Sequence, residues 1–349
     1  MTKNELRTKA AELKKEQPKL RAVNLAEQLG VSEAELVSTN EKATRLTEDW
    51  EGIFKAVETL GYVMALTRNK SVVHERKGEY HNISFEGHVG LVLDPNIDLR
   101  IFQNRFGFVF AVPVESPRGT LRSIQFFDKK GVAAHKIYLM NEEHISDYDA
   151  LVQSFAHPDQ ESELEFSNSA GRPPQANGNV EHEFNAEAFL SDWSELKDTH
   201  DFYPLLMKHK VERTKALEVA EGRFTLKVDN SATEMMLNKA SEEQVSIMVF
   251  VSSGPVIQIH TGEVEKIKKM DNWLNVLDSE FNLHLREDHI AHSWVVEKPT
   301  EDGIVTSLEI FDEDRNNIAT FFGARKPGKP ELETWRSLIA EIREEGVLA

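Results

Sequence analysis

Cysteine is absent from the 349 residues of this sequence. Its absence excludes disulfides, thiolate metal ligands, iron–sulfur clusters and cysteine nucleophiles, so any metal must be bound by His, Tyr, Met or carboxylates. The sequence also has no apolar run of the roughly 18 residues that a membrane-spanning helix needs. Its polar, charged start lacks the apolar core of a signal peptide. These absences predict a cytoplasmic protein without a membrane span.

Basic residues are in the minority. The 41 Lys and Arg residues stand against 59 Asp and Glu residues, which gives a formal net charge of -18. A field of that sign opposes nucleic-acid phosphates, and no Lys/Arg-rich stripe offsets it locally. We therefore expect no nucleic-acid partner. An anionic ligand would need a few basic residues directed inward, against the background charge.

Common catalytic motifs are also missing. The sequence has no GxGxxG after a strand, no GxxxxGK[ST], no GxSxG and no HExxH. The closest approach to a metal cluster is HLREDHIAH, which contains His284, His289 and His292. On a strand, His284 and His292 share one face and His289 points to the other, so the three cannot converge on one ion.

What the sequence does have is an internal duplication. Residues 67–138 align without a gap onto residues 251–322. A repeat this long is a duplicated domain, because solenoid units run to roughly 20–50 residues. Residues that make the fold should match between the copies, and residues that make a function should appear where the copies differ. Matching pairs include Leu93 and Leu277, Leu99 and Leu283, Gly119 and Gly303, and Phe127 and Phe311.

The hydrophobic period changes along each copy. Helical spacing predicts helices within 2–61, with Gly30 as a C-cap and a capping box from Ser32 to Glu35. Short β-branched and aromatic segments of period two then predict antiparallel strands over 62–139, followed by a helix over 143–155. The second copy repeats the order with helices at 186–221, strands at 223–322 and a last helix near 329–345. We expect repeats at 1–155 and 184–349, with residues 156–183 as a linker rich in Gly, Pro, Ser and Asn.

His200 marks the first difference between the copies. Alignment of the N-terminal helices places it opposite Leu20. Asp198 or Thr199 can cap this helix, which puts His200 in its first turn. The positive helix end favours neutral imidazole, the form that an iron atom needs. Taken alone, the residue is typical of a surface histidine at a helix start.

Basic residues mark four further differences. Arg100 aligns with His284, and on its strand it shares a face with Phe102 while Leu99 faces the core. Lys298 stands opposite Val114, and its position predicts an ammonium at the rim of an apolar wall. Each of the four basic residues, taken singly, is typical of a solvated surface charge. The other two are Arg213, opposite Glu33, and Arg325, opposite Asn141.

Taken together, these residues resemble a known family. The order DLRIF, THDFYPLLMKHKVERTKAL, WVVEK and FFGARKPG is similar to the cytoplasmic haem-trafficking and hemin-degrading proteins of the HemS/ChuS/PhuS/HmuS type. The resemblance covers nearly the whole chain and is specific in the ensemble of motifs. It implies an internally duplicated α+β fold of two large antiparallel β-sheets, packed together and flanked by helices.

The resemblance also implies a site for one haem b (iron protoporphyrin IX) per chain. His200 would be the proximal iron ligand, and Arg100 would be the distal and catalytic residue with Phe102 nearby. The propionates would be bound by Arg213, Lys298 and Arg325. Phe322 belongs to the same site, although some family members have Tyr there, and Thr320 stands where Gln is expected. Fewer propionate hydrogen bonds follow from those two departures.

Two haem functions remain open at this point. The chain either carries imported haem or opens the porphyrin ring in a haem oxygenase-like reaction that releases iron, with haem as cofactor and substrate. Implied partners are the cytoplasmic side of a haem importer and a downstream haem oxygenase or electron donor. The alternative is a non-haem ligand-binding or protein-interaction module of the same duplicated fold. The sequence leaves open the oligomeric state and whether His209 can replace His200.

Overall fold

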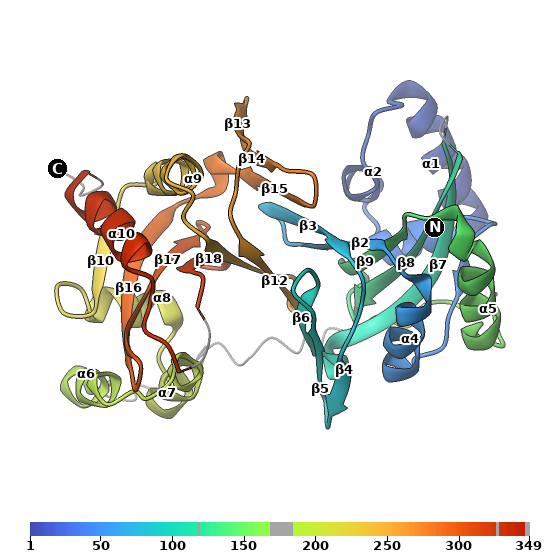
Figure 1. Ribbon diagram of the computed structural model, residues 1–349. Coiled ribbons are helices and arrows are strands. Elements are labelled where there is room, and N and C mark those ends of the chain that lie inside the picture. The colour runs from blue at the N-terminus through green and yellow to red at the C-terminus, as the bar shows by residue number, and fades with distance from the viewer. Residues whose placement is uncertain (117–118, 168–183, 326–327, 346–349) are drawn as a thin grey trace. The chain divides into compact units, whose positions relative to one another are not determined.

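The chain divides into two compact units. Unit 1 comprises Met1–Arg68, Glu75–Gly171 and Ser252–Gln258, and unit 2 comprises Asn69–His74, Arg172–Val251 and Ile259–Ala349. The structure is a computed structural model that describes all residues except 117–118, 168–183, 326–327 and 346–349 (Figure 1).

Unit 1 contains the first five helices and most of the first nine strands. Its helices are α1 (Lys3–Glu16), α2 (Ala22–Leu29), α3 (Glu33–Ser38), α4 (Trp50–Val57) and α5 (Ile145–Phe155). Its strands are β1 (Thr44–Arg45), β2 (Val63–Arg68), β4 (Ile83–Glu86), β5 (Val89–Leu93), β6 (Asp98–Phe102), β7 (Phe106–Ser116), β8 (Gly119–Asp128) and β9 (Ala133–Leu139). The division between the units falls within β3 (Val72–Gly78) and β12 (Val256–Gly262).

Unit 2 contains the later elements. Its helices are α6 (Ala186–Ser194), the 3₁₀ turn η4 (Thr199–Asp201), α7 (Phe202–His209), α8 (Arg213–Val219), α9 (Ala232–Glu242) and α10 (Glu333–Glu345). Its strands are β10 (Thr225–Val228), β11 (Ile247–Ser252), β13 (Ile267–Met270), β14 (Trp273–Leu277), β15 (Phe281–Arg286), β16 (His292–Thr300), β17 (Gly303–Phe311) and β18 (Asn317–Gly323).

The strands form two nine-stranded antiparallel sheets. Their orders are β1-β7-β8-β9-β2-β3-β15-β14-β13 and β10-β16-β17-β18-β11-β12-β6-β5-β4. The predicted α+β class, with two large antiparallel sheets flanked by helices, is confirmed. Consecutive strands joined by short turns explain the result, because the period-two segments in this sequence are separated by Gly, Asn and Lys turns.

The main core of unit 1 lies between the helices α4 and α5 and strands of both sheets. Alternation along β7 directs Val109 and Ala111 into this core and Phe110 into a smaller cluster under α3. Phe54 of α4 stacks on Phe126 of β8, with ring centroids 4.6 Å apart. Aromatic burial of this kind contributes strongly to stability, so these contacts fix the two helices on the sheet.

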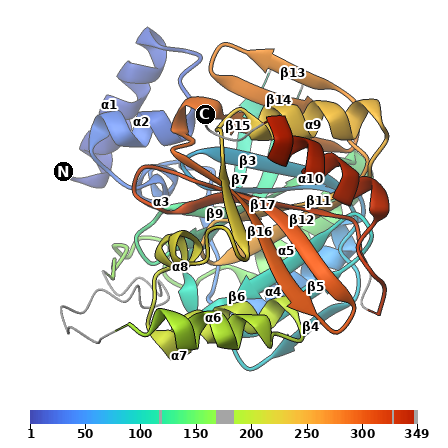
Figure 2. The same cartoon turned by 90° about the vertical axis from the view of Figure 1, so that its left-hand side faces the viewer.

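In unit 2, helices pack on both faces of the β16–β17–β18 segment. Val295 lies in a core with α9 and α10, whereas Trp294 and Val296 lie in a core with α6, α7 and α8. Figure 2 shows α6 and α7 side by side, with α8 next to them. Trp193 of α6 stacks on Phe224 at 5.3 Å between centroids. Helix α7, which follows His200, is therefore held against the Trp294 face of the sheet.

Two local predictions are confirmed, and one is wrong. Gly30 ends α2 in the left-handed region at φ 68°, and Ser32 and Glu35 form the capping box of α3. The strands expected throughout 223–322 are interrupted by α9, in which Met236 and Leu237 are fully buried. The copies align only from residue 251, so the preceding segment had no counterpart to guide it, and its helical spacing was missed.

The expected linker falls partly outside the described residues, because residues 168–183 are not among them. The described residues 156–167 belong to unit 1. There the backbone N–H of His157 donates to the carbonyl of Arg45 at 2.9 Å, and that of Ser167 donates to Lys129 at 3.0 Å. The repeat boundaries stay a prediction.

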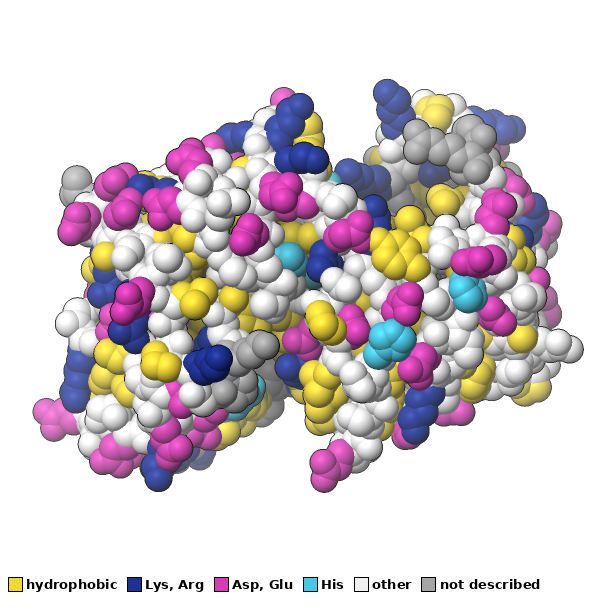
Figure 3. Space-filling view, viewed as in Figure 1, with side chains coloured by type: hydrophobic (Ala, Val, Ile, Leu, Met, Phe, Trp, Pro, Cys, Tyr) yellow, Lys and Arg dark blue, Asp and Glu magenta, His cyan; other side chains and the backbone are white. Residues whose placement is uncertain are grey.

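On the face drawn in Figure 3, Lys and Arg side chains are interspersed with Asp and Glu. Among the helices in the described part of the chain, none is long and apolar enough to cross a membrane.

Candidate functional site

The predicted site residues fall into two groups. Unit 2 contains five of them, namely His200, Arg213, Lys298, Phe322 and Arg325. Unit 1 contains Arg100 and Phe102 on β6.

His200 lies in the turn η4, directly before α7. The sequence placed it in the first turn of an α-helix, and the structure places it in a 3₁₀ turn capped by Asp198. One oxygen of Asp198, Oδ1, accepts from the backbone N–H of His200 at 2.8 Å and from its Nδ1 at 2.5 Å. The His200 side chain is 90% exposed. Because Nδ1 donates to the carboxylate, Nε2 is left as the acceptor that can bind a metal.

The Asp198 carboxylate is a charge beside the His200 ring that the sequence argument did not consider. A helix start was expected to favour neutral imidazole, yet a carboxylate adjoins this ring. The backbone N–H of His200 is the main cause that lowers the pKa of Asp198, with further lowering from the His200 ring and from Arg325. Asp198 is therefore a carboxylate that orients the ring, a role that carboxylates have beside many metal-binding histidines.

Arg213 and Lys298 both bind one buried acid, Glu309, which the sequence argument missed. Arg213 donates to it in a two-pronged contact, with Nε to Oε2 and Nη2 to Oε1 both at 2.8 Å. Lys298 Nζ donates to Oε1 at 2.8 Å. Glu309 is fully buried and Lys298 is 2% exposed. The structure thus buries Lys298 in an ion triad, where the sequence had placed its ammonium at a rim.

Charge pairing keeps this triad ionised. Burial opposes the charged form of Glu309, but Arg213 and Lys298 together lower its pKa to about 2. Burial lowers the pKa of Lys298, with a further decrease from Arg213, and Glu309 opposes that decrease. Removal of one member would leave a buried charge without compensation.

Phe202 connects the triad to the His200 turn. It is the first residue of α7, two positions after His200, and is 2% exposed. The guanidinium carbon of Arg213 lies 5.2 Å from its ring centroid, and Lys298 Nζ lies 4.8 Å from it. Lys298 Nζ also lies 5.7 Å from the ring centroid of Phe322. These cation–π contacts place four of the named side chains in one cluster beside the histidine turn.

Arg325 is paired with a different acid, Asp302. Its Nη2 is 3.6 Å from Oδ2 of Asp302, and its side chain is 15% exposed. Its charge also acts on Asp198, as the lowered pKa of that carboxyl indicates. Arg325 therefore interacts electrostatically with Asp198.

One signal for Glu309 was present in the sequence. The gap-free alignment pairs it with Gln125, so a neutral residue in the first copy becomes an acid in the second. An acid within an apolar strand indicates a buried partner, because isolated charges are rarely buried. Asp198 also stood in the sequence but was considered only as a helix cap.

In unit 1, the predicted strand face of Arg100 is confirmed. Leu99 and Ile101 are fully buried, while Arg100 and Phe102 are half-buried. Arg100 pairs with the carboxylate of Asp98, whose pKa is raised by burial although Arg100 opposes the shift. The guanidinium carbon of Arg105 lies 4.4 Å from the ring centroid of Phe102.

Other histidines are engaged elsewhere. His209 Nε2 contacts Oδ2 of Asp192 at 2.5 Å, and its side chain is 12% exposed. His284 Nδ1 contacts Oδ1 of Asn275 at 2.7 Å. Within the described ranges, no group of three or more His, Asp or Glu residues could hold a metal ion. His200 is thus an exposed histidine with one ring nitrogen directed to a carboxylate.

Comparison with known proteins gives consistent matches over the whole chain. Residues 30–155 and 210–342 match the family described as the haemin-degrading HemS/ChuX domain. The hemin transport protein HemS of Yersinia enterocolitica is 38% identical over 340 residues, which cover 96% of each chain. Holo-PhuS of Pseudomonas aeruginosa, a heme-binding protein, superposes with a TM-score of 0.94 at 44% identity, covering 98% of this chain and 99% of that one. The heme-degrading enzyme ChuS of Escherichia coli O157:H7 superposes with a TM-score of 0.90 at 34% identity and the same coverage.

Proposed function

This chain belongs to the family of the haemin-degrading HemS/ChuX domain, and from that membership we propose that it binds haem through His200 in haem uptake. The observation that carries the proposal is the contact of His200 with Asp198, which leaves Nε2 free on a ring that is 90% exposed. Haem is a flat apolar ring with an iron and two carboxylates, so it needs one imidazole and a few cations. Addition of hemin should give the Soret band of a histidine-bound haem, and a chain without that band would refute the proposal.

We assign the propionates to the basic residues of unit 2. Arg213 and Arg325 are the partly exposed cations of the group, with side chains 31% and 15% exposed. Lys298 is buried, so we expect it to act mainly by holding Glu309 and Arg213 in place. One histidine and one set of cations correspond to one haem b per chain.

Arg325→Ala should weaken hemin binding about ten- to a hundredfold, because a charge-assisted hydrogen bond contributes roughly 1.5–3 kcal/mol. Haem dimethyl ester lacks the propionate charges, so the variant and wild type should bind it equally. Arg286→Ala is the matched control, since Arg286 is the last residue of β15 in unit 2 and pairs with Asp288 instead. A full penalty with the ester would show that Arg325 acts through folding instead.

Asp198 is the proposed positioning residue for His200. Asp198→Asn removes the charge that accepts from Nδ1, so we expect hemin affinity to fall about tenfold, at the lower end of the usual cost of outer-shell changes. The iron–histidine stretching frequency of the ferrous complex should fall as well, because the imidazole becomes a weaker base.

Asp192→Asn is a close control for this change, since Asp192 makes the same kind of contact with His209. It should leave both the affinity and the stretching frequency unchanged. An Asp198→Asn complex with the wild-type frequency would show that the carboxylate serves only as a cap of the turn.

Carriage of haem is the function that the exposed ligand supports best, because an accessible imidazole suits exchange with another protein. Ring opening is the second candidate, favoured by the similarity to ChuS, which is described as a heme oxygenase. We keep Arg100 as the proposed distal and catalytic residue with Phe102 beside it. The importer, the downstream oxygenase or electron donor, and the cytoplasmic location stay predictions.

Arg100→Ala should retain haem with a modest loss of affinity but slow any ring opening driven by ascorbate, because the guanidinium donates hydrogen bonds at every accessible pH. Product analysis over time measures the rate. Arg100→Lys keeps the charge without the planar guanidinium and should restore part of the ring-opening rate. Ring opening at the wild-type rate in Arg100→Ala would remove Arg100 from the mechanism, and no ring opening in wild type would leave carriage alone.

A further inference from the structure

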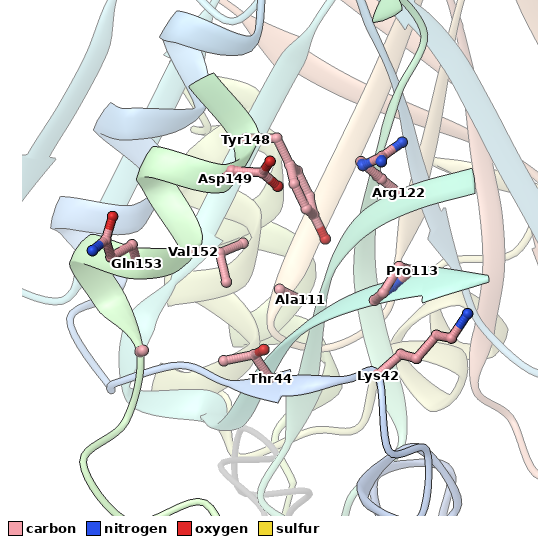
Figure 4. Close-up of a pocket in the computed structure, with 10 residues that line it drawn as sticks. Lys42, Thr44, Ala111, Pro113, Arg122, Tyr148, Asp149, Val152 and Gln153 are labelled. Atoms are coloured by element: carbon pink, nitrogen blue, oxygen red, sulfur yellow. The ribbon is translucent and has the colours of Figure 1, made fainter. Parts of the chain in front are cut away.

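Unit 1 contains a pocket that none of the proposed haem residues lines. It has a volume of about 350 Å³ and lies between α5 and the strands β1, β7 and β8 (Figure 4). We call it the α5 pocket. Its lining residues include Lys42, Ala111, Arg122, Tyr148, Asp149 and Val152.

The α5 pocket combines an apolar floor with the guanidinium of Arg122, which makes few hydrogen bonds within the described part of the chain. Figure 4 shows Tyr148 and Val152 projecting from α5 toward the strand that carries Ala111 and Pro113. Arg122 is half-buried, and among the described residues its one hydrogen bond reaches the carbonyl of Thr120 at 3.5 Å. A guanidinium presents several N–H donors in a geometry that matches a carboxylate. Arg122, half-buried with a single long hydrogen bond among the described residues, can therefore donate further hydrogen bonds to a ligand.

The charges around the pocket favour a ligand with a single negative charge. Lys42 is already paired with Glu115, with Nζ 2.9 Å from Oε1. Burial raises the pKa of Tyr148, Arg122 opposes that rise and Asp149 adds to it. Because Asp149 also lines the pocket, a dianion would be repelled more strongly than a monoanion.

The second copy provides an internal comparison for the pocket. The alignment pairs Ala111 with Val295 and Arg122 with Thr306, so both positions differ between the copies. In unit 2 the fully buried Trp335 of α10 lies on the corresponding sheet face, and its indole N–H donates to the carbonyl of Thr306 at 3.0 Å. In unit 1 the smaller Tyr148 donates to the carbonyl of Ser123 at 3.1 Å. The fold therefore does not require a hollow under α5.

We propose that the α5 pocket binds a small, flat molecule with an apolar body and one carboxylate, which Arg122 binds while α5 and β7 enclose the body. This site is separate from the proposed haem function and does not depend on it. The slot between a helix and a sheet suits a flat ligand, and apolar pockets with a few directed polar groups are the usual form of small-molecule sites.

The test uses 2-naphthoate as the probe on the full chain, with and without one equivalent of hemin to fill any haem site. Isothermal titration should show saturable binding in both cases. Arg122→Gln should weaken 2-naphthoate about ten- to a hundredfold and should affect the uncharged 2-naphthamide little. Arg45→Gln is the matched control, because Arg45 is half-buried on β1, at the edge of the same sheet, and donates to Ser162 instead.

Val152→Phe should fill the pocket and abolish binding of both probes. Its thermal unfolding temperature shows whether it is folded, and if it is not, Arg122→Gln decides the question. No saturable binding to wild type, or an Arg122→Gln variant that binds 2-naphthoate as wild type does, would overturn the proposal.

Discussion

The His200→Ala variant should lose its native Soret band and bind hemin more than about a hundredfold more weakly than wild type. Loss of a residue that hydrogen-bonds a metal ligand lowers metal affinity about 10–100-fold, so loss of the ligand itself should lower it more. The measurement is a hemin titration followed by absorption. The remaining cations of unit 2 would still attract hemin. We therefore expect weak hemin binding that lacks the spectrum of a histidine-bound haem.

His209→Ala is the matched control for this experiment. His209 lies nine residues on in the same helical segment, but its ring is turned to Asp192 and is 12% exposed. Its removal should leave the spectrum and affinity as they are. A His200→Ala variant with the native spectrum would assign the iron to another residue. If only the double variant lost that spectrum, His209 would be the substitute ligand.

Glu309→Gln should destabilise the protein by about 3–5 kcal/mol, because it leaves the buried Lys298 ammonium without its counter-charge. For a unit of this size such a loss corresponds to a decrease of roughly 6–20 °C in unfolding temperature. The substitution changes the side-chain volume little, so the loss reports charge rather than packing. Calorimetry of the haem-free chain measures it.

The pH dependence gives a second measure of the same residue. The folded pKa of Glu309 is about 2, below its ordinary value of 4.5, so its stabilisation is present above pH 4.5 and is lost as pH falls toward 2. Between pH 7 and pH 4 this group should account for about 1 kcal/mol of the wild-type decrease in unfolding free energy. Glu309→Gln lacks that component.

A Lys298→Met background is the control for Glu309→Gln. It replaces the buried ammonium with an apolar chain of similar length, so Glu309→Gln should cost much less there. An equal cost in both backgrounds would show that the Lys298–Glu309 pair contributes nothing, and that the loss arises from Arg213 or from packing.

Much of the fold was predictable from local patterns. Period-two segments predicted the antiparallel strands, and the Ser32–Glu35 spacing predicted the cap of α3, because both signals are short-range. The resemblance to the HemS/ChuS/PhuS/HmuS type is confirmed by full-length similarity to HemS. Helix α9 was missed because the alignment of the two copies began after it.

The site was only partly predictable. The comparison of copies picked out His200, Arg213 and Lys298, since each replaces a residue of a different kind. It could not reveal that Arg213 and Lys298 both bind Glu309. Arg213 is on α8, whereas Lys298 and Glu309 are on β16 and β17, far along the chain. The α5 pocket was likewise out of reach, because a cavity depends on how side chains pack in three dimensions.

The most direct test of the central claim is a hemin titration of the wild-type chain followed at the Soret band. We expect a sharp break at one equivalent per chain, with the spectrum of a haem bound by one histidine. A rise without a break would contradict a built site. A break at two equivalents would contradict the assignment of a single haem to His200.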